Sequence, residues 1–171
     1  MRTLFLIIAI VSVLFACMSS RNTFVSSDDW NQTTKMEYRF GDASVAPEYH
    51  RSYTISITRE SITISIDSYG NILMTRNYPN TQERFQEFKD KLAAKGLYKH
   101  QKKDNACSGG TCEYIRLYKN DVRYFDGYVY HCEGENGDLF LPDGTSSLFL
   151  EQIPDDIKSL IEMSRKEQEE S

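Results

Sequence analysis

The stretch YTISITRESITISI, residues 53–66, alternates large apolar with small polar side chains on both sides of a central Arg-Glu pair. A period of two residues is typical of a β-strand with one buried face and one solvent face. We predict a hairpin with Arg59 and Glu60 at its turn, in a tight or a four-residue loop. Either loop places every large apolar residue on one face, whereas a slip of one residue would expose half of them. The predicted pairs are Tyr53 with Ile66, Ile55 with Ile64 and Ile57 with Ile62.

After residue 79 the period of the sequence changes and indicates a helix. Asn80-Thr-Gln-Glu83 resembles a capping box, in which Asn80 would accept from first-turn amides and Glu83 would reach back. Three apolar residues follow at helical spacing: Phe85, Phe88 and Leu92. Gly96 is suited to the left-handed residue that ends a helix. We expect this amphipathic helix to pack on the isoleucine face of the hairpin.

A second hairpin is predicted from residues 113–118 and 122–130, on either side of Lys119-Asn120. Apolar residues collect on one face if Leu117 lies opposite Val122 and Ile115 lies opposite Tyr124. Outside the two hairpins we predict strands at residues 37–40, 72–75 and 147–150, a loop at 134–144 and a helix at 155–165. This order indicates an α+β domain with a mostly antiparallel sheet built from hairpins, covered on one face by one or two helices.

The N-terminus has the parts of a secretory signal peptide. Arg2 supplies a positive start, residues 4–15 are apolar except for Ser12, and the small residue Ala16 precedes Cys17. The apolar run is shorter than the about 20 residues that a membrane-spanning helix needs.

Leu14-Phe15-Ala16-Cys17 resembles the lipobox of bacterial lipoproteins, although Phe15 replaces the small or branched residue usual there. The resemblance implies cleavage before Cys17 and its acylation, which would anchor the protein to a membrane without spanning it. An ordinary signal peptide or an uncleaved anchor is the alternative. Asp does not follow Cys17, and the same resemblance then implies the outer membrane, facing the periplasm. Residues 44–53 resemble a signature of an uncharacterised small periplasmic lipoprotein family.

The predicted organisation is a signal peptide at residues 1–16, a lipidated tether at 17–33, a single α+β domain at 34–165 and a frayed polar tail at 166–171. An alternative starts the domain at Trp30, the only tryptophan. Loss of Arg2 with the leader changes the formal net charge from −5 to −6. Nucleic-acid binding needs clustered Lys and Arg, so we expect no nucleic acid partner. We also expect no cofactor.

Cysteine usage predicts a disulfide, because an exported domain lies in an oxidising compartment. The segment CSGGTC, residues 107–112, contains two glycines that allow a tight turn, so Cys107 with Cys112 is the simplest pairing. Pairing of Cys132 with either of them is the alternative, because connectivity does not follow from sequence. A zinc site at His131 and Cys132 is disfavoured, since no second pair has regular ligand spacing.

Two regions are candidates for partner binding. The loop Glu48-Tyr49-His50-Arg51 follows Pro47 and could bind an anionic group, or it could only fix the loop to the domain through paired charges. The other region is the outer face of the second hairpin, because tyrosine is enriched at protein interfaces. The alternative is that tyrosine merely suits strands. The tyrosines concerned are Tyr114, Tyr118, Tyr128 and Tyr130.

The sequence contains no Gly-rich phosphate loop, no Gly-x-Ser-x-Gly and no His-Glu-x-x-His, so we predict no catalytic residues. We expect a non-catalytic binding protein with a protein partner. Its layout of an anchor and a compact sheet-and-helix domain resembles that of periplasmic lysozyme inhibitors and of immunity proteins that neutralise toxins. A structural or assembly lipoprotein of the envelope is the second hypothesis. A hydrolase that uses His50 or His131 is the third.

Overall fold

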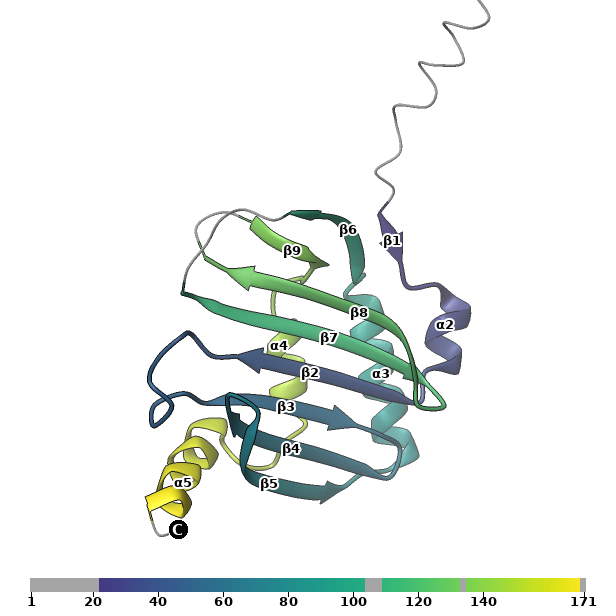
Figure 1. Cartoon of the computed structure of the whole chain (residues 1–171). Helices are drawn as coiled ribbons and strands as arrows, with labels where there is room; N and C mark the ends of the chain where they lie inside the picture. The colour runs from purple at the N-terminus through teal and green to yellow at the C-terminus, as the bar shows by residue number, and fades with distance from the viewer. Residues whose placement is uncertain (1–21, 104–108, 133–134, 170–171) are drawn as a thin grey trace, which may run out of the picture.

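The computed structural model describes residues 22–103, 109–132 and 135–169. Within these ranges, nine strands form one antiparallel sheet in the order β1-β6-β9-β8-β7-β2-β3-β4-β5 (Figure 1). The strands are β1 (Thr23–Phe24), β2 (Lys35–Gly41), β3 (Ser52–Ile57), β4 (Ser61–Ser68), β5 (Asn71–Pro79), β6 (Tyr98–Lys103), β7 (Thr111–Lys119), β8 (Val122–His131) and β9 (Glu135–Phe140). The helices are α2 (Ser27–Gln32), α3 (Gln82–Ala94), α4 (Thr145–Leu150) and α5 (Ile157–Glu169).

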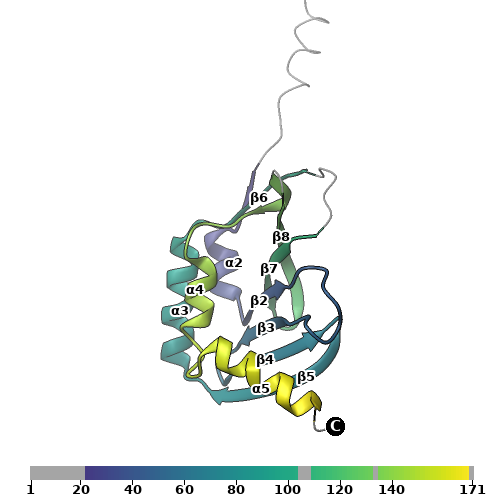
Figure 2. The ribbon, with the colours of Figure 1, turned by 90° about the vertical axis from the view of Figure 1, so that its left-hand side faces the viewer.

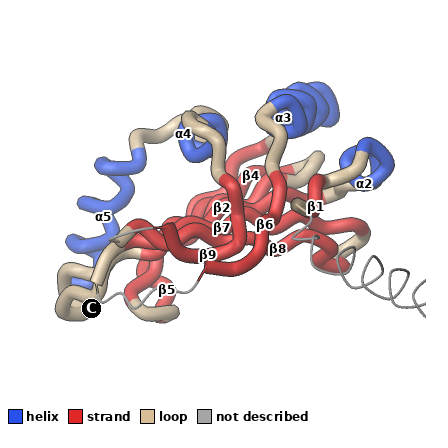
Figure 3. The backbone as a smooth tube through the Cα atoms, turned by 90° about the horizontal axis from the view of Figure 1, so that it is seen from above, coloured by secondary structure: helices blue, strands red, loops and turns tan. Residues whose placement is uncertain are grey.

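The helices lie on one side of the sheet. Figure 3 shows α2, α3 and α4 over the same face, and Figure 2 shows α5 beside the β5 edge. We call the covered face the inner face and the opposite one the outer face. The inner face and the helices supply the core, whose fully buried members include Met36, Tyr38, Ile55, Ile64, Ile115, Leu117, Phe85, Phe88, Leu92 and Phe149. The predicted α+β architecture is confirmed.

The first hairpin has the predicted register. β3 and β4 pair with Tyr53 opposite Ile66, Ile55 opposite Ile64 and Ile57 opposite Ile62, and all six side chains are buried. The amide of Thr58 donates to the carbonyl of Ser61 at 2.9 Å. This bond closes the hairpin around Arg59 and Glu60, at the predicted turn.

α3 begins and ends close to the predicted residues, but its cap is different. The hydroxyl of Thr81 accepts the Arg84 amide at 3.2 Å. The side-chain amide of Asn80 instead donates to the Thr58 carbonyl at 2.6 Å, which ties the helix start to the first hairpin. Gly96 has a φ of 71° directly after the helix, as predicted.

The turn of the second hairpin differs from the prediction. Asn120 and Asp121 have φ angles of 46° and 67°, and Lys119 lies opposite Val122. A two-residue turn with two positive φ angles matches the right-handed twist of hairpin strands. The predicted pairing of Leu117 with Val122 was therefore wrong, and Val122 is 68% exposed.

A bulge at Tyr124 causes the rest of the register difference. The additional residue in β8 places Phe125 opposite Leu117 and Gly127 opposite Ile115. Phe125 is buried on the inner face opposite Leu117, the place predicted for Val122, and Gly127 takes the place predicted for Tyr124. A one-residue insertion reverses which side chains face the core.

Besides β1, two strands lie where the sequence predicted none. β6 has the sequence YKHQKK, and its charged residues hide the period of a strand. β9 occupies much of the predicted loop at 134–144, and Tyr98 of β6 lies opposite Phe140 of β9. Pairing on the neighbouring strands, which no local pattern shows, determines these two elements.

α4 occupies the place of the predicted edge strand at 147–150. Phe149 is fully buried, with its ring 4.9 Å from that of Phe88 and 5.3 Å from that of Tyr38. The apolar run Leu148-Phe149-Leu150 is too short for its period to separate helix from strand.

Both ends of the domain extend beyond the prediction. The Ser26 hydroxyl caps α2 by accepting the Asp29 amide at 3.1 Å, and Trp30 is buried. The segment 23–33 therefore belongs to the domain, as in the alternative that starts it near Trp30, and the predicted tether is shorter. At the other end α5 runs to Glu169, so most of the predicted frayed tail is helical, and Glu167 forms an ion pair with Arg76 at 3.0 Å.

Candidate functional site

The loop at residues 48–51, the first candidate region, is held by its own side chains. His50 is buried, its ring stacks on Tyr69 at a centroid distance of 3.8 Å, and its Nδ1 accepts the Tyr69 amide at 3.2 Å. Arg51 is also buried and donates to the His50 carbonyl at 2.7 Å and to the Ser164 hydroxyl at 3.3 Å. These contacts join the loop to the turn after β4 and to α5.

The burial of His50 and Arg51 corrects their assignment as partner-binding residues. Burial, together with the charge of Arg165, lowers the pKa of Arg51 below the ordinary arginine value. Such a guanidinium holds the loop backbone in place and does not contact a ligand. This agrees with the alternative prediction that these residues only fix the loop to the domain. Tyr49 is 65% exposed and Glu48 is also exposed, so only these two remain accessible from this region.

The outer face of the second hairpin carries the other candidate residues. Tyr114 of β7 lies opposite Tyr128 of β8, and their rings stack with centroids 5.7 Å apart. Side chains alternate along a strand, so Tyr118 shares this face. Tyr130 pairs with Cys112 two residues further along β8. The predicted grouping of tyrosines on one uncovered face is therefore observed.

Basic side chains lie over the tyrosine rings of this face. The distances from the cationic atom to the ring centroid are 3.8 Å for Lys35 over Tyr118, 5.2 Å for Arg116 over Tyr114 and 6.0 Å for Lys102 over Tyr128. A cation within about 6 Å of a ring centroid is attracted to the ring face. The rings are therefore held in place before any partner arrives.

Carboxylates complete the network on the outer face. Glu37 accepts the Tyr118 hydroxyl at 2.5 Å and lies 3.2 Å from Lys35. Asp126 pairs with Arg116 at 3.2 Å and with Arg123 at 3.0 Å. Burial and the Glu37 carboxylate raise the pKa of Tyr118 to about 12, so its hydroxyl remains a donor at neutral pH. We call this set of tyrosines, cations and carboxylates on β2, β6, β7 and β8 the tyrosine network.

The contribution of β2 to this network was not predicted from the sequence. Lys35, Glu37 and Arg39 alternate with Met36 and Tyr38, which is the signal that could have revealed an outer face. The pairing of β2 with β7 joins residues about 80 positions apart, and the local pattern does not give that neighbour.

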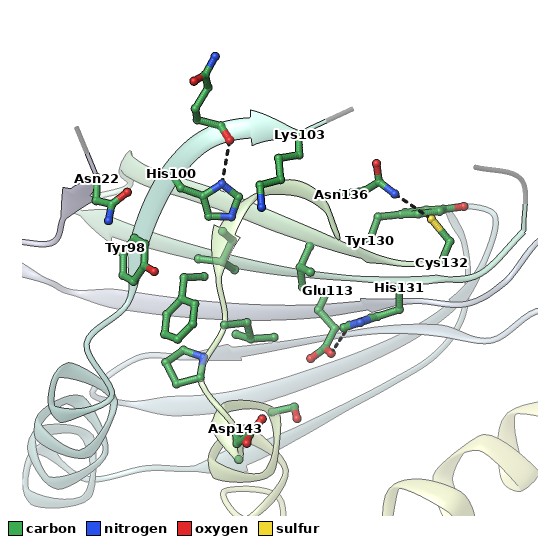
Figure 4. Close-up of a pocket in the computed structure, with 18 residues that line it drawn as sticks. Asn22, Tyr98, His100, Lys103, Glu113, Tyr130, His131, Cys132, Asn136 and Asp143 are labelled. Carbon is green, nitrogen blue, oxygen red and sulfur yellow. Dashed lines mark hydrogen bonds and ion pairs between the residues drawn. The ribbon is translucent and has the colours of Figure 1, made fainter. Parts of the chain in front are cut away.

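A cavity of about 1080 Å³ lies at the other end of the second hairpin, between β6, β8, β9 and the start of α4 (Figure 4). His131 and Glu113 point toward each other, with His131 Nε2 2.7 Å from Glu113 Oε1. The Tyr38 hydroxyl donates to the other oxygen of Glu113 at 2.6 Å. Apolar and aromatic side chains, including Tyr98 and Phe140, also line the cavity.

The contacts of the two candidate histidines do not favour the hydrolase hypothesis. Cys132, beside His131, is disulfide-bonded and cannot supply a thiolate. His50 lies beneath Tyr69. In the part of the chain that the structure describes, no group of three or more His, Cys, Asp or Glu side chains is placed to hold a metal ion. None of the helices within the described ranges is long and apolar enough to cross a membrane.

The cysteines differ from the predicted pairing. Cys112 is a free thiol, so the bond predicted between Cys107 and Cys112 is not formed. Cys132 is disulfide-bonded, and its partner lies outside the described residues, as do Cys17 and Cys107. Asn136 donates to the Cys132 sulfur at 3.1 Å.

Comparison with known proteins gives no relative: no family model, no curated protein and no solved structure matches this chain. Geometry and chemistry therefore carry the functional argument.

Proposed function

We propose that this chain is a non-catalytic binding protein, anchored by a lipid at Cys17 to the outer membrane and facing the periplasm. The observation that carries the proposal is the tyrosine network on the outer face, which the described helices leave uncovered. Tyrosine and arginine are the residue types on which binding energy concentrates at protein interfaces.

The network suits a protein partner because its side chains are already ordered. Tyr114 and Tyr128 stack on each other, and the hydroxyl of Tyr118 is held by Glu37. Binding costs less conformational entropy when side chains are fixed beforehand. Cations and carboxylates alternate across the face, which favours a partner with a mixed surface over a strongly charged polymer. A toxin or a lysozyme-like enzyme that the domain inhibits is the class of partner we propose.

Capture of partners from envelope extract tests this proposal. The mature wild-type protein, the Tyr128→Ala variant and the Tyr49→Ala variant are immobilised separately, and bound proteins are identified by mass spectrometry. Tyr49 is a matched control because it is an exposed tyrosine away from the network. Truncation of a hot-spot tyrosine costs about 2 kcal/mol or more, which weakens the affinity about 30-fold.

The expected result is a partner that the wild type and the Tyr49→Ala variant capture and the Tyr128→Ala variant loses, at unchanged melting temperature. A partner lost only with Tyr49→Ala would place the interface on the loop at residues 48–51. Loss of binding in step with loss of stability would show that Tyr128 only packs.

Lipidation is tested at Cys17 itself. The Cys17→Ser variant should accumulate as an unprocessed precursor without a lipid label, because the thiol is the acylated group. Normal processing and release of this variant from the membrane would refute the lipid anchor. It would not affect the proposal that the tyrosine network binds a partner.

A further inference from the structure

Three aromatic rings form a row across the β1 edge of the sheet. The centroid of the Tyr98 ring lies 4.9 Å from that of Phe24 in β1 and 4.7 Å from that of Phe140 in β9. Phe24 is 61% exposed and Phe140 is 44% exposed. Stacked rings at a sheet edge that remain open to solvent are a feature of binding surfaces rather than of a core. We call this row the aromatic edge.

The strand that carries the middle ring is basic. β6 has the sequence YKHQKK and adds Lys99, Lys102, Lys103 and His100 to the aromatic edge. Lys99 pairs with Asp138 and Lys102 lies over the Tyr128 ring, while the side chains of residues 101–103 remain exposed. Exposed aromatic rings beside lysines are the combination that proteins present to the headgroup region of a bilayer.

The aromatic edge lies close to the N-terminal attachment point, which indicates that a membrane covers it. Figures 1 and 2 both show β1 at one end of the molecule and α5 at the other. Six residue steps separate Cys17 from Thr23, which span at most about 20–22 Å when fully extended. A lipid on Cys17 therefore holds the β1 edge close to the bilayer, whereas the β5 edge lies eight strand spacings, or about 38 Å, further away. This step rests on the lipidation in the proposed function.

We propose that the aromatic edge is a membrane-docking surface, in which Phe24, Tyr98 and Phe140 enter the headgroup region of the anchoring leaflet. The basic strand β6 then lies next to lipid phosphates, which attract basic side chains close to the surface. The lipid anchor alone would allow the domain to rotate freely about the tether. Docking of the edge fixes the orientation of the domain on the bilayer.

Contact quenching of tryptophan emission tests the docking. The full lipidated protein is reconstituted into vesicles of phosphatidylethanolamine and phosphatidylglycerol, with or without bromine on the acyl chains. The Phe140→Trp variant reports on the aromatic edge. The Ile72→Trp variant is the matched control, because Ile72 is 65% exposed on β5 at the opposite edge. Trp30, the only native tryptophan, is buried, and the wild-type signal supplies its contribution.

Brominated lipid should quench the added emission of the Phe140→Trp variant and leave that of the Ile72→Trp variant unchanged. Adding Phe24→Ser, Lys102→Glu and Lys103→Glu to the Phe140→Trp variant should restore the emission. Equal quenching in the first two variants, or none in either, would overturn the docking. If the added tryptophan is instead buried in a dimer, whether or not the lipid carries bromine, a second copy of the chain covers this edge. That result would also overturn the docking.

Mass spectrometry of the same preparations separates failure of the docking from failure of the anchor. Acylated protein that floats with the vesicles but shows no selective quenching refutes the docking and leaves the anchor intact. Protein without acyl chains refutes the anchor and, with it, the argument for the docking.

Discussion

Replacing Ile57 with alanine tests which face of the sheet is buried, and hence which face is free for a partner. Ile57 is fully buried between Met36 of β2 and Ile62 of β4. Removal of its side chain beyond Cβ loses apolar burial and leaves a cavity, which together cost about 2–5 kcal/mol. For a domain of this size about 1 kcal/mol shifts the melting temperature by about 3 °C, so we expect a decrease of about 6–15 °C.

The neighbouring position supplies the control. Ser56 faces outward between Glu37 and Thr63, and Ser56→Ala should change the free energy of unfolding by less than about 0.5 kcal/mol. Thr58 is unsuitable, because its hydroxyl accepts the amides of Glu60 and Ser61 in the turn. Urea denaturation followed by circular dichroism measures both variants. Similar losses at positions 56 and 57 would refute the assignment of the inner and outer faces.

Three further predictions concern titrating groups and cysteines. Burial raises the pKa of Asp67, but hydrogen bonds from Arg39 and the Gly70 amide outweigh it and hold this pKa below its ordinary value of 3.8. The stabilisation is therefore present above pH 3.8 and is lost as the pH falls through the lower folded value, so Asp67→Asn should lower stability at neutral pH and flatten its decline in acid. An unchanged acid profile would contradict this. Burial raises the pKa of Tyr53, Tyr78, Tyr118 and Tyr124 from 10.0 to about 12. The stabilisation from these protonated tyrosines should then be fully present below pH 10 and decrease as the pH rises to 12. Urea midpoints that stay constant between pH 10 and 12 would contradict this prediction. Peptide mapping without reductant should link Cys132 to Cys107 and leave Cys112 alkylatable, because Cys112 is free and a Cβ on Gly110 would lie 3.3 Å from Cys132 Cβ; a Cys107–Cys112 peptide would refute the pairing.

The contrast between the two hairpins shows what the sequence can predict. In residues 53–66 the apolar period is unbroken on both strands, so one register buries every isoleucine and the prediction was correct. In the second hairpin the bulge at Tyr124 interrupts the period in the middle of β8. Both Tyr124 and Phe125 can fill an inner position, so the apolar pattern alone does not decide between the two registers.

Burial, rather than residue type, separates the two candidate sites. Glu48-Tyr49-His50-Arg51 has the composition of a binding loop, yet its His and Arg are buried against Tyr69 and Ser164. The tyrosines of β7 and β8 were identified from the sequence, but their partners on β2 were not. A site whose members meet across paired strands requires the strand order, which only the folded structure supplies.

The strand order also relates the two proposed surfaces to each other. If the β1 edge rests on the bilayer, β8 and β2 lie three and five strand spacings above it, or about 14–24 Å. The tyrosine network then faces sideways at this height, because its strands run along the membrane rather than away from it. A compact partner of about 100 residues has a radius of gyration of about 13 Å, so it fits beside the network without entering the lipid. A much larger partner must extend upward past β5, and cross-links from such a partner should then appear on the β3–β5 part of the outer face.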